Sequence, residues 1–194
     1  MKIEIRSDDH VHISGYVNAV ERRSHVLRRP GAPPFREIVM PGTFRKAIEK
    51  GNTIELRLNH DRVLCDTGSG LELREDNVGL YASADISDRE TVKAAREGRL
   101  TGWSFGFYCV KDNWRNEEGT ELRELEEIQL DEVSILTKKP AYIATSVEVR
   151  DDEYLRERRY TEDGVEVSDN KADLSAYAAE IEILSLNNNG GDEQ

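Results

Sequence analysis

The chain has 194 residues and a formal net charge of −12, and this length is sufficient for one domain with a hydrophobic core and a tail. An acidic chain without a dense basic stripe is a poor candidate for binding nucleic acid through its phosphates. No apolar run reaches the roughly 18 residues of a membrane span, and the N-terminus lacks a signal-peptide pattern. We therefore expect a cytosolic protein in which both cysteines, Cys65 and Cys109, are reduced and buried.

Short strands and two helices are predicted in the first hundred residues. Alternation of apolar and polar residues predicts strands at residues 2–6, 10–20, 37–40 and 53–59 and a meander over residues 64–82. Apolar spacing predicts a helix over residues 44–51, with Thr43 as its cap. The capping box Ser87-Asp88-Arg89-Glu90 begins a second helix, which ends at Gly98. Arginines and prolines predict an exposed loop over residues 22–36.

Charge increases in the second half of the chain. We expect a charged hairpin loop over residues 111–120, a polar strand over 121–128 and an apolar strand over 129–137. Regular alternation in the last strand places Leu130, Glu132, Ser134 and Leu136 on one face, and Asp131, Val133 and Ile135 on the other. The predicted domain is residues 1–150. Residues 151–194 are predicted to be a flexible acidic extension with one weak helix near residues 174–184.

The stretch around Ser104 is unusual because glycine stands two residues before and two residues after the serine. In a strand, Trp103, Phe105, Phe107 and Cys109 face the core, while the serine shares the other face with Gly102 and Gly106. The missing side chains leave the hydroxyl at the floor of a groove that an extended peptide could enter. On these residues alone, a structural bulge or barrel corner is the stronger interpretation.

A histidine, a serine and a carboxylate occur on three separate predicted strands. His60 follows one strand end, Ser104 lies within a second strand, and Glu132 lies within a third. Serine needs a base to remove its proton, and a carboxylate can orient the imidazole that serves as this base. Backbone N–H groups would then have to stabilise the oxyanion. Two alternatives stay open: a purely structural His60, and a metal site of His60, Cys65 and Cys109, which lacks the usual paired-cysteine spacing.

Three motifs in this order resemble the prohead maturation proteases of tailed bacteriophages. They are Asn59-His60-Asp61, the run Gly98-x-Leu100-x-Gly102-x-Ser104-Phe105-Gly106-Phe107, and Leu130-x-Glu132-Val133-Ser134-Ile135-x-Thr137 followed by Pro140-Ala141-Tyr142. The resemblance covers roughly residues 10–150. This family is related to the herpesvirus assemblins. The resemblance therefore implies a mainly β (α+β) fold, a closed or partly open antiparallel β-barrel with a few peripheral helices.

The resemblance also implies roles for the three side chains. Ser104 would be the nucleophile and His60 the general base. Assemblins use a second histidine as the third member, but no histidine follows Ser104 in this chain, so a carboxylate must take that place. Glu132 matches the motif and shares a face with Ser134, which favours it over the adjacent Asp131, although a bulge would reverse the two faces. Asp61 is expected to be a turn residue.

The implied function is a serine endopeptidase that cleaves capsid and scaffold proteins, and also itself, inside the procapsid that assembles in the host cytoplasm. No cofactor or metal is implied, and neither nucleic acid nor membrane is an expected partner, whereas a homo-oligomer is. The alternative is a non-catalytic assembly module that keeps the fold to bind capsid or scaffold subunits. Labelling by a serine-directed phosphonate discriminates between the two.

Overall fold

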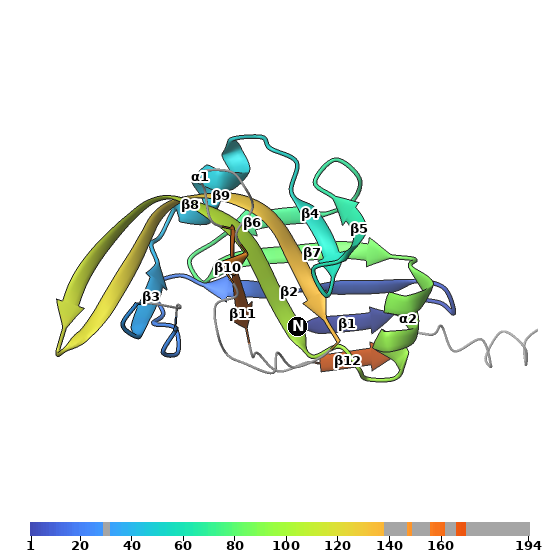
Figure 1. The fold of residues 1–194 in the computed structure, drawn as a ribbon. Helices are drawn as coiled ribbons and strands as arrows, with labels where there is room; N and C mark the ends of the chain where they lie inside the picture. Colours follow the sequence, from blue (N-terminus) through green and yellow to red (C-terminus); the bar gives the residue numbers. More distant parts are fainter. Residues whose placement is uncertain (29–31, 138–146, 149–155, 162–165, 170–194) are drawn as a thin grey trace, which may run out of the picture.

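The computed structural model describes residues 1–28, 32–137, 147–148, 156–161 and 166–169, and these form a mainly β protein with two helices (Figure 1). The helices are α1 (Thr43–Glu49) and α2 (Arg89–Arg96). The strands are β1 (Lys2–Ile5), β2 (Val11–Ala19), β3 (Phe35–Val39), β4 (Glu55–Leu58), β5 (Arg62–Asp66), β6 (Glu72–Glu75), β7 (Gly79–Ile86), β8 (Gly102–Glu117), β9 (Thr120–Leu136), β10 (Val147–Glu148), β11 (Arg156–Thr161) and β12 (Glu166–Asp169). Within the described ranges, neither helix has the length and apolar character needed to cross a bilayer.

The strands form two sheets. One sheet has the order β12-β1-β2-β7-β6, and the other has the order β10-β11-β8-β9-β4-β5, with β3 also paired to β9. The expected mainly β fold with peripheral helices is confirmed, but a closed barrel is not confirmed, because both sheets keep edge strands among the residues described. The pairing is also not wholly antiparallel: β1 with β12, β3 with β9 and β4 with β9 are parallel pairs. The connection through α1 returns the chain between β3 and β4, which allows both strands to run in the same direction along β9.

The β8–β9 hairpin is the longest element and arches across the molecule (Figure 1). The predicted loop over residues 111–120 is wrong, because β8 continues to Glu117 and the turn is confined to Glu118 and Gly119, both with positive φ. Charged side chains do not break these strands, since they pair across the exposed face of the hairpin. Arg115 Nε, for example, donates to Glu124 Oε1 at 2.7 Å. One continuous strand, β9, likewise replaces the two strands predicted at residues 121–137.

Aromatic side chains of β8 form the centre of the core, as the alternation predicts. Trp103, Phe105 and Phe107 are fully buried, and the Phe105 ring lies edge-on to Phe44 of α1 at a centroid distance of 5.4 Å. Cys109 is only half-buried. The N-cap position of α1 is Gly42, and Thr43 is the first residue of the helix. The Thr43 hydroxyl donates to the carbonyl of Leu125 and thereby anchors α1 to β9.

A β-bulge in β9 changes the predicted faces of this strand. Gly106 pairs with Glu132 while Phe107 pairs with Leu130, which leaves Asp131 as an extra residue opposite β8. Regular alternation therefore fails at this point, and Leu130 lies on the core face opposite Phe107 instead of sharing a face with Glu132. Ser134 and Glu132 still share a face, because the bulge lies on the N-terminal side of both.

Two segments beyond residue 150 pair with the sheets of the preceding part. β11 lies antiparallel along β8, and β12 lies parallel to β1 (Figure 1). The division of the chain at residue 150 stays a prediction, and the weak helix predicted near residues 174–184 lies outside the described residues. The Pro140-Ala141-Tyr142 motif and the centre of the predicted 22–36 loop, at residues 29–31, lie outside them as well.

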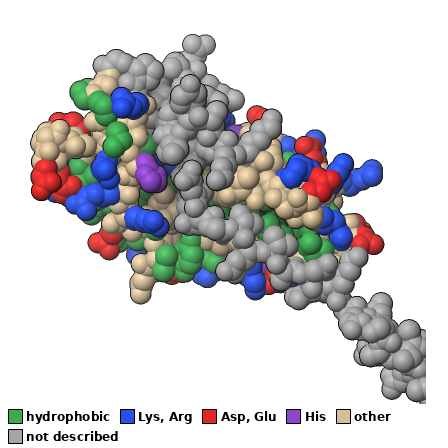
Figure 2. All heavy atoms as spheres, turned by 90° about the horizontal axis from the view of Figure 1, so that it is seen from below, with side chains coloured by type: hydrophobic (Ala, Val, Ile, Leu, Met, Phe, Trp, Pro, Cys, Tyr) green, Lys and Arg blue, Asp and Glu red, His purple; other side chains and the backbone are tan. Residues whose placement is uncertain are grey.

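Basic and acidic side chains are interspersed on the face drawn in Figure 2. Among the described residues visible there, neither sign forms a large continuous area, and apolar side chains lie between them. Exposed ion pairs, such as that between Arg115 of β8 and Glu124 of β9, add little to stability individually.

Candidate active site

Four neighbouring strands, in the order β11-β8-β9-β4, carry the residues singled out by the sequence. Their registers align two rows that cross the sheet, Tyr160–Ser104–Ser134–Arg57 and Arg158–Gly106–Glu132–Glu55. Because paired positions point to the same face, Ser104 and Glu132 lie on one face, on adjacent strands and one row apart. The motif residues that are distant in the sequence are thus brought to one side of this sheet.

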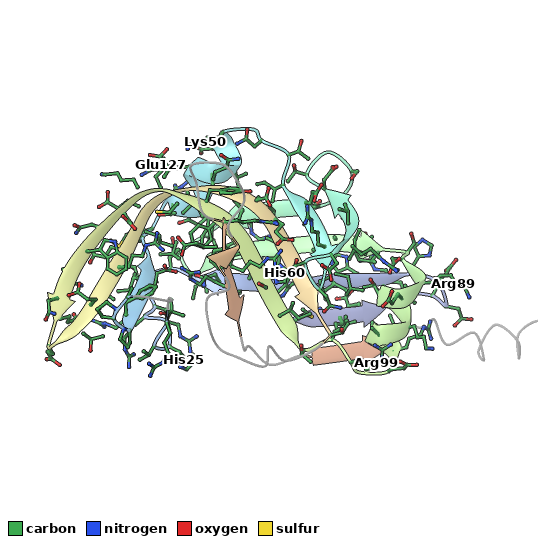
Figure 3. All side chains as sticks on the ribbon, viewed as in Figure 1. His25, Lys50, His60, Arg89, Arg99 and Glu127 are labelled. Carbon is green, nitrogen blue, oxygen red and sulfur yellow. The ribbon has the colours of Figure 1, made fainter. Side chains whose placement is uncertain are left out.

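A rigid turn positions His60 beside this face. It directly follows β4, and both Asn59 and His60 adopt left-handed backbone conformations, with φ of 53° and 70°. Non-glycine residues hold this conformation only when their surroundings fix it. Asn59 is fixed to the end of β9, because its Oδ1 accepts from the backbone N–H of Thr137 at 2.9 Å and its own N–H donates to Ile135. His60 consequently lies near the middle of the molecule, beside β8 and β9 (Figure 3).

The imidazole of His60 contacts the carboxylate of Glu132. His60 Nδ1 and Glu132 Oε1 are 2.7 Å apart, and the side chains are 7% and 0% exposed. The other carboxylate oxygen, Oε2, accepts from the Ser134 hydroxyl at 3.0 Å. Asp131, the alternative acid, is partly exposed and forms an ion pair with Arg156 instead. The carboxylate beside the imidazole is therefore the one from the motif position.

The charge of Glu132 is stabilised although the side chain is buried. Burial raises the pKa of a carboxyl group, but the hydrogen bond and charge of His60 and the charges of Arg156 and Arg57 outweigh this effect, so the pKa of Glu132 lies below its ordinary value of 4.5. Arg57 Nε lies 3.5 Å from Oε2. A carboxylate that stays ionised at neutral pH is suited to orient an imidazole and to stabilise its protonated form.

Ser104 is held by a different partner. Its side chain is completely buried, and its hydroxyl donates to the backbone carbonyl of Arg159 on β11 at 2.7 Å. A hydroxyl has one proton, so this hydrogen bond directs the proton away from the imidazole. The structure therefore brings His60 and Glu132 into contact and places Ser104 on the same side of the sheet, with its proton bound to β11.

The second glycine of the serine motif makes room for the carboxylate. A Cβ at Gly106 would lie 2.9 Å from Oε1 and 3.0 Å from Cγ of Glu132, which is closer than ordinary packing allows. Gly106 has no positive φ, so the requirement for glycine here is one of space and not of backbone conformation. The sequence pattern predicted an open groove above the serine, whereas Glu132 fills the space above this glycine.

Sequence reasoning missed the arginines around Glu132. Arg156 of β11 lies 3.0 Å from Oε1, and Arg158 Nε lies 3.5 Å from the same oxygen. The signal was a cluster of three arginines, at 156, 158 and 159, within an otherwise acidic region. A charged segment is solvated unless it has partners in the folded domain, so the sequence predicted a flexible region and no contacts for these arginines.

The proposed metal alternative gains no support from the geometry. Among the residues that the structure describes, no group of three His, Cys, Asp or Glu side chains has a metal-binding arrangement. Both thiols are free and half-buried, and burial raises the pKa of Cys65 and of Cys109 to about 11. Thiols in this state are poor nucleophiles at neutral pH.

Comparison with known proteins gives a match to a protein family. A family model described as caudovirus prohead serine protease matches residues 1–158, which include Ser104, His60, Glu132 and the first residues of β11. No curated protein matches the chain. No solved structure matches it either.

We expect Gly106→Ala to destabilise the protein by about 1–3 kcal/mol, because the added methyl group collides with the Glu132 carboxylate. A double-mutant cycle measured by urea unfolding tests whether the collision with Glu132 causes this loss of stability. In a Glu132→Ala background, where the colliding atoms are absent, the same change should cost less than in the wild-type chain. An equal cost in both backgrounds would contradict this explanation.

We expect the contribution of Glu132 to stability to depend on pH in a defined direction. Its pKa is lowered in the folded chain, so folding is favoured above the ordinary value of 4.5, and this contribution is lost as pH falls through the lower folded pKa. The difference in unfolding free energy between wild type and Glu132→Gln should shrink as the pH falls from about 5 towards about 3.5, because the carboxylate is protonated in this range. A difference that does not change over this range would refute the assignment.

Proposed function

Because the chain belongs to the caudovirus prohead serine proteases, which act on capsid-related proteins within the phage procapsid, we propose that Ser104, His60 and Glu132 form its catalytic triad. The observation that carries this proposal is the contact of 2.7 Å between His60 Nδ1 and Glu132 Oε1. This contact engages Nδ1 and thereby orients the imidazole ring. Nε2 is then the nitrogen that exchanges a proton with the serine, as in other serine hydrolases.

Each group has one role in the proposed mechanism. The Ser104 oxygen attacks the carbonyl carbon of an extended peptide while His60 Nε2 takes its proton, and Glu132 stabilises the positive imidazole. The tetrahedral oxyanion is stabilised by backbone N–H groups, and His60 then gives the proton to the leaving amine. Water attacks the acyl-enzyme in a second cycle of the same transfers. The hydroxyl must first turn from the Arg159 carbonyl, where it donates at 2.7 Å, towards the imidazole.

We further propose capsid and scaffold proteins as the substrates, with the chain itself as an additional one. The family is described as prohead serine proteases, and this description supports proteins of the assembling head as substrates. An extended peptide is the form of substrate that a sheet-borne serine accepts best, because main-chain pairing with a strand can align the scissile bond. A homo-oligomer remains part of the expectation.

One observation favours the second candidate function, a non-catalytic assembly module. Ser104 is completely buried and hydrogen-bonded to β11, an arrangement that a purely structural serine would also show. Such a module would have no need for an ionised Glu132 in contact with His60. The triad therefore accounts for more of the buried charge, and the two functions differ in whether Ser104 reacts with a serine-directed phosphonate.

We expect Ser104→Ala to abolish phosphonate labelling and to reduce cleavage of the coat protein by about four to six orders of magnitude, because the nucleophile is removed. Cleavage is measured by N-terminal mapping of the products. Ser87→Ala, at an exposed serine before α2, is the matched control and should keep full activity. Undiminished cleavage by the Ser104→Ala chain would show that another group is the nucleophile.

Adjacent acids provide a second test of the triad. Glu132→Gln should lower kcat/KM by about two to four orders of magnitude, because an amide cannot stabilise the imidazolium in the same way. Asp131→Asn, which changes a carboxylate that pairs with Arg156, should lower it by less than about tenfold. The reverse order of these two effects would assign the role to Asp131.

A further inference from the structure

β11 occupies an edge of β8 next to Ser104. Six residues of β11 pair antiparallel with Trp103–Tyr108, and the carbonyl of Arg159 accepts the Ser104 hydroxyl. A substrate that pairs with β8 at this position would need the same backbone groups. Because Ser104 is completely buried with β11 present, a substrate and β11 cannot occupy this edge together.

Arg156 and Arg158 lie on the outer face of β11, which is the face that Ser104 shares on β8, and they lie close to Glu132, the partner of His60. Arg156 lies 3.0 Å from Glu132 Oε1, the oxygen that also contacts His60. A guanidinium at this distance opposes the positive charge that the imidazole acquires when it takes the serine proton. With β11 in place, the Ser104 proton is hydrogen-bonded to the Arg159 carbonyl, and the Arg156 guanidinium lies beside the carboxylate that orients His60. Both contacts disfavour the transfer of the serine proton to the imidazole.

Glu157 and Arg159 lie on the inner face of β11, which faces the core, and belong to a buried cluster of four charged side chains. Arg159 donates to both oxygens of Glu37 on β3, from Nε and from one terminal nitrogen, each at 2.6 Å. Glu157 accepts from Arg123 of β9 at 2.7 and 2.8 Å. All four side chains are buried, and Arg159 also lies over the ring of Phe107 at 5.1 Å.

The charges of this cluster divide evenly between β11 and the rest of the protein. β11 contributes Glu157 and Arg159, and the strands β3 and β9 contribute Glu37 and Arg123. When β11 leaves, Glu37 and Arg123 remain as partners at 3.2 Å, and Arg123 keeps its contact with Asp112 at 2.5 Å. No unpaired buried charge is created, so the usual large penalty for breaking a buried pair does not apply to this step.

We propose that this edge of β8 is the substrate-binding edge of the protease, and that residues 156–161 occupy it as an internal pseudosubstrate. The inference rests on the proposed function. In the bound peptide, Glu37 recognises a basic residue at the position of Arg159, whose carbonyl lies at the nucleophile, and Arg123 recognises an acidic residue two positions earlier. The preferred substrate is thus an extended peptide with an acid, any residue, and then a base whose carbonyl is attacked.

The first experiment measures the rate at which a small fluorophosphonate labels Ser104 in the full-length chain. Arg159→Glu places an acid between Glu37 and Glu157, which expels β11, and should increase this rate at least about tenfold. Arg115→Glu, at an exposed arginine on the far part of β8, should leave the rate unchanged. Equal rates in Arg159→Glu and wild type would overturn the pseudosubstrate.

A second variant covers the case in which Arg159→Glu fails to fold. Arg156→Gln keeps the cluster of Glu37, Arg123, Glu157 and Arg159 intact and removes the guanidinium that contacts Glu132 and Asp131. It should also increase labelling, and an unchanged rate in this variant would count against the proposal in the same way. Folding of each variant is verified by a cooperative urea transition.

Peptide binding tests recognition without requiring hydrolysis. A synthetic peptide of residues 154–163 should bind to an Ser104→Ala/Arg159→Glu chain, as measured by fluorescence anisotropy, because the vacated edge matches it. The same peptide carrying Glu at the Arg159 position should bind at least about tenfold more weakly, and adding Glu37→Gln to the protein should remove this preference. Equal binding of both peptides would overturn the assigned specificity.

The two experiments separate the inference from the function on which it rests. Peptide binding without phosphonate labelling in any variant would refute the catalytic role of Ser104 while leaving the binding edge in place. Labelling at one common rate, together with no binding of the peptide, would refute the pseudosubstrate and retain the protease. Rapid labelling of Arg159→Glu and selective binding of the basic peptide are the results expected.

Discussion

The arrangement of the site depends on the pairing of three strands with β9. β8 lies along one edge of β9, and β3 and β4 lie in parallel along the other. Glu132 therefore stands between β8, which carries Ser104, and β4, which precedes His60, and its carboxylate contacts the imidazole. The Asn59 side chain fixes the turn after β4 to the end of β9, and this positions the imidazole of His60.

Buried charged side chains are concentrated on both faces of the sheet around β8, and pairing between opposite charges offsets the free energy of removing them from water. On one face, Glu132 lies among His60, Arg57 and Arg156; on the other, two acids and two bases form the cluster between β3, β9 and β11. Buried ion pairs of this kind contribute little net stability compared with apolar packing. What they contribute here is specificity of register: a one-residue slip of β11 would turn Arg159 away from Glu37 and towards the face that carries Ser104 and Glu132.

The sequence was sufficient for those parts that depend on local pattern. Alternation predicted that Trp103, Phe105 and Phe107 form the core, and the resemblance of the motifs favoured Glu132 as the partner of His60, which is the carboxylate that contacts it. Pattern failed where pairing across the sheet decides the outcome. The bulge at Asp131 follows from the register with β8, and charged residues 111–117 stay in a strand because the opposite strand supplies their counter-charges.

β11 could not be predicted from its own composition, because its charges are explained only by residues far away in the chain. Glu37 is 122 residues from Arg159, and neither side chain would be buried without the other. The two faces of this short strand have different consequences. Its inner charges fix the register on β8 by pairing with Glu37 and Arg123, and this register brings the Arg159 carbonyl to Ser104. The same interactions that hold the strand therefore determine which peptide bond a competing substrate would have to present to the serine.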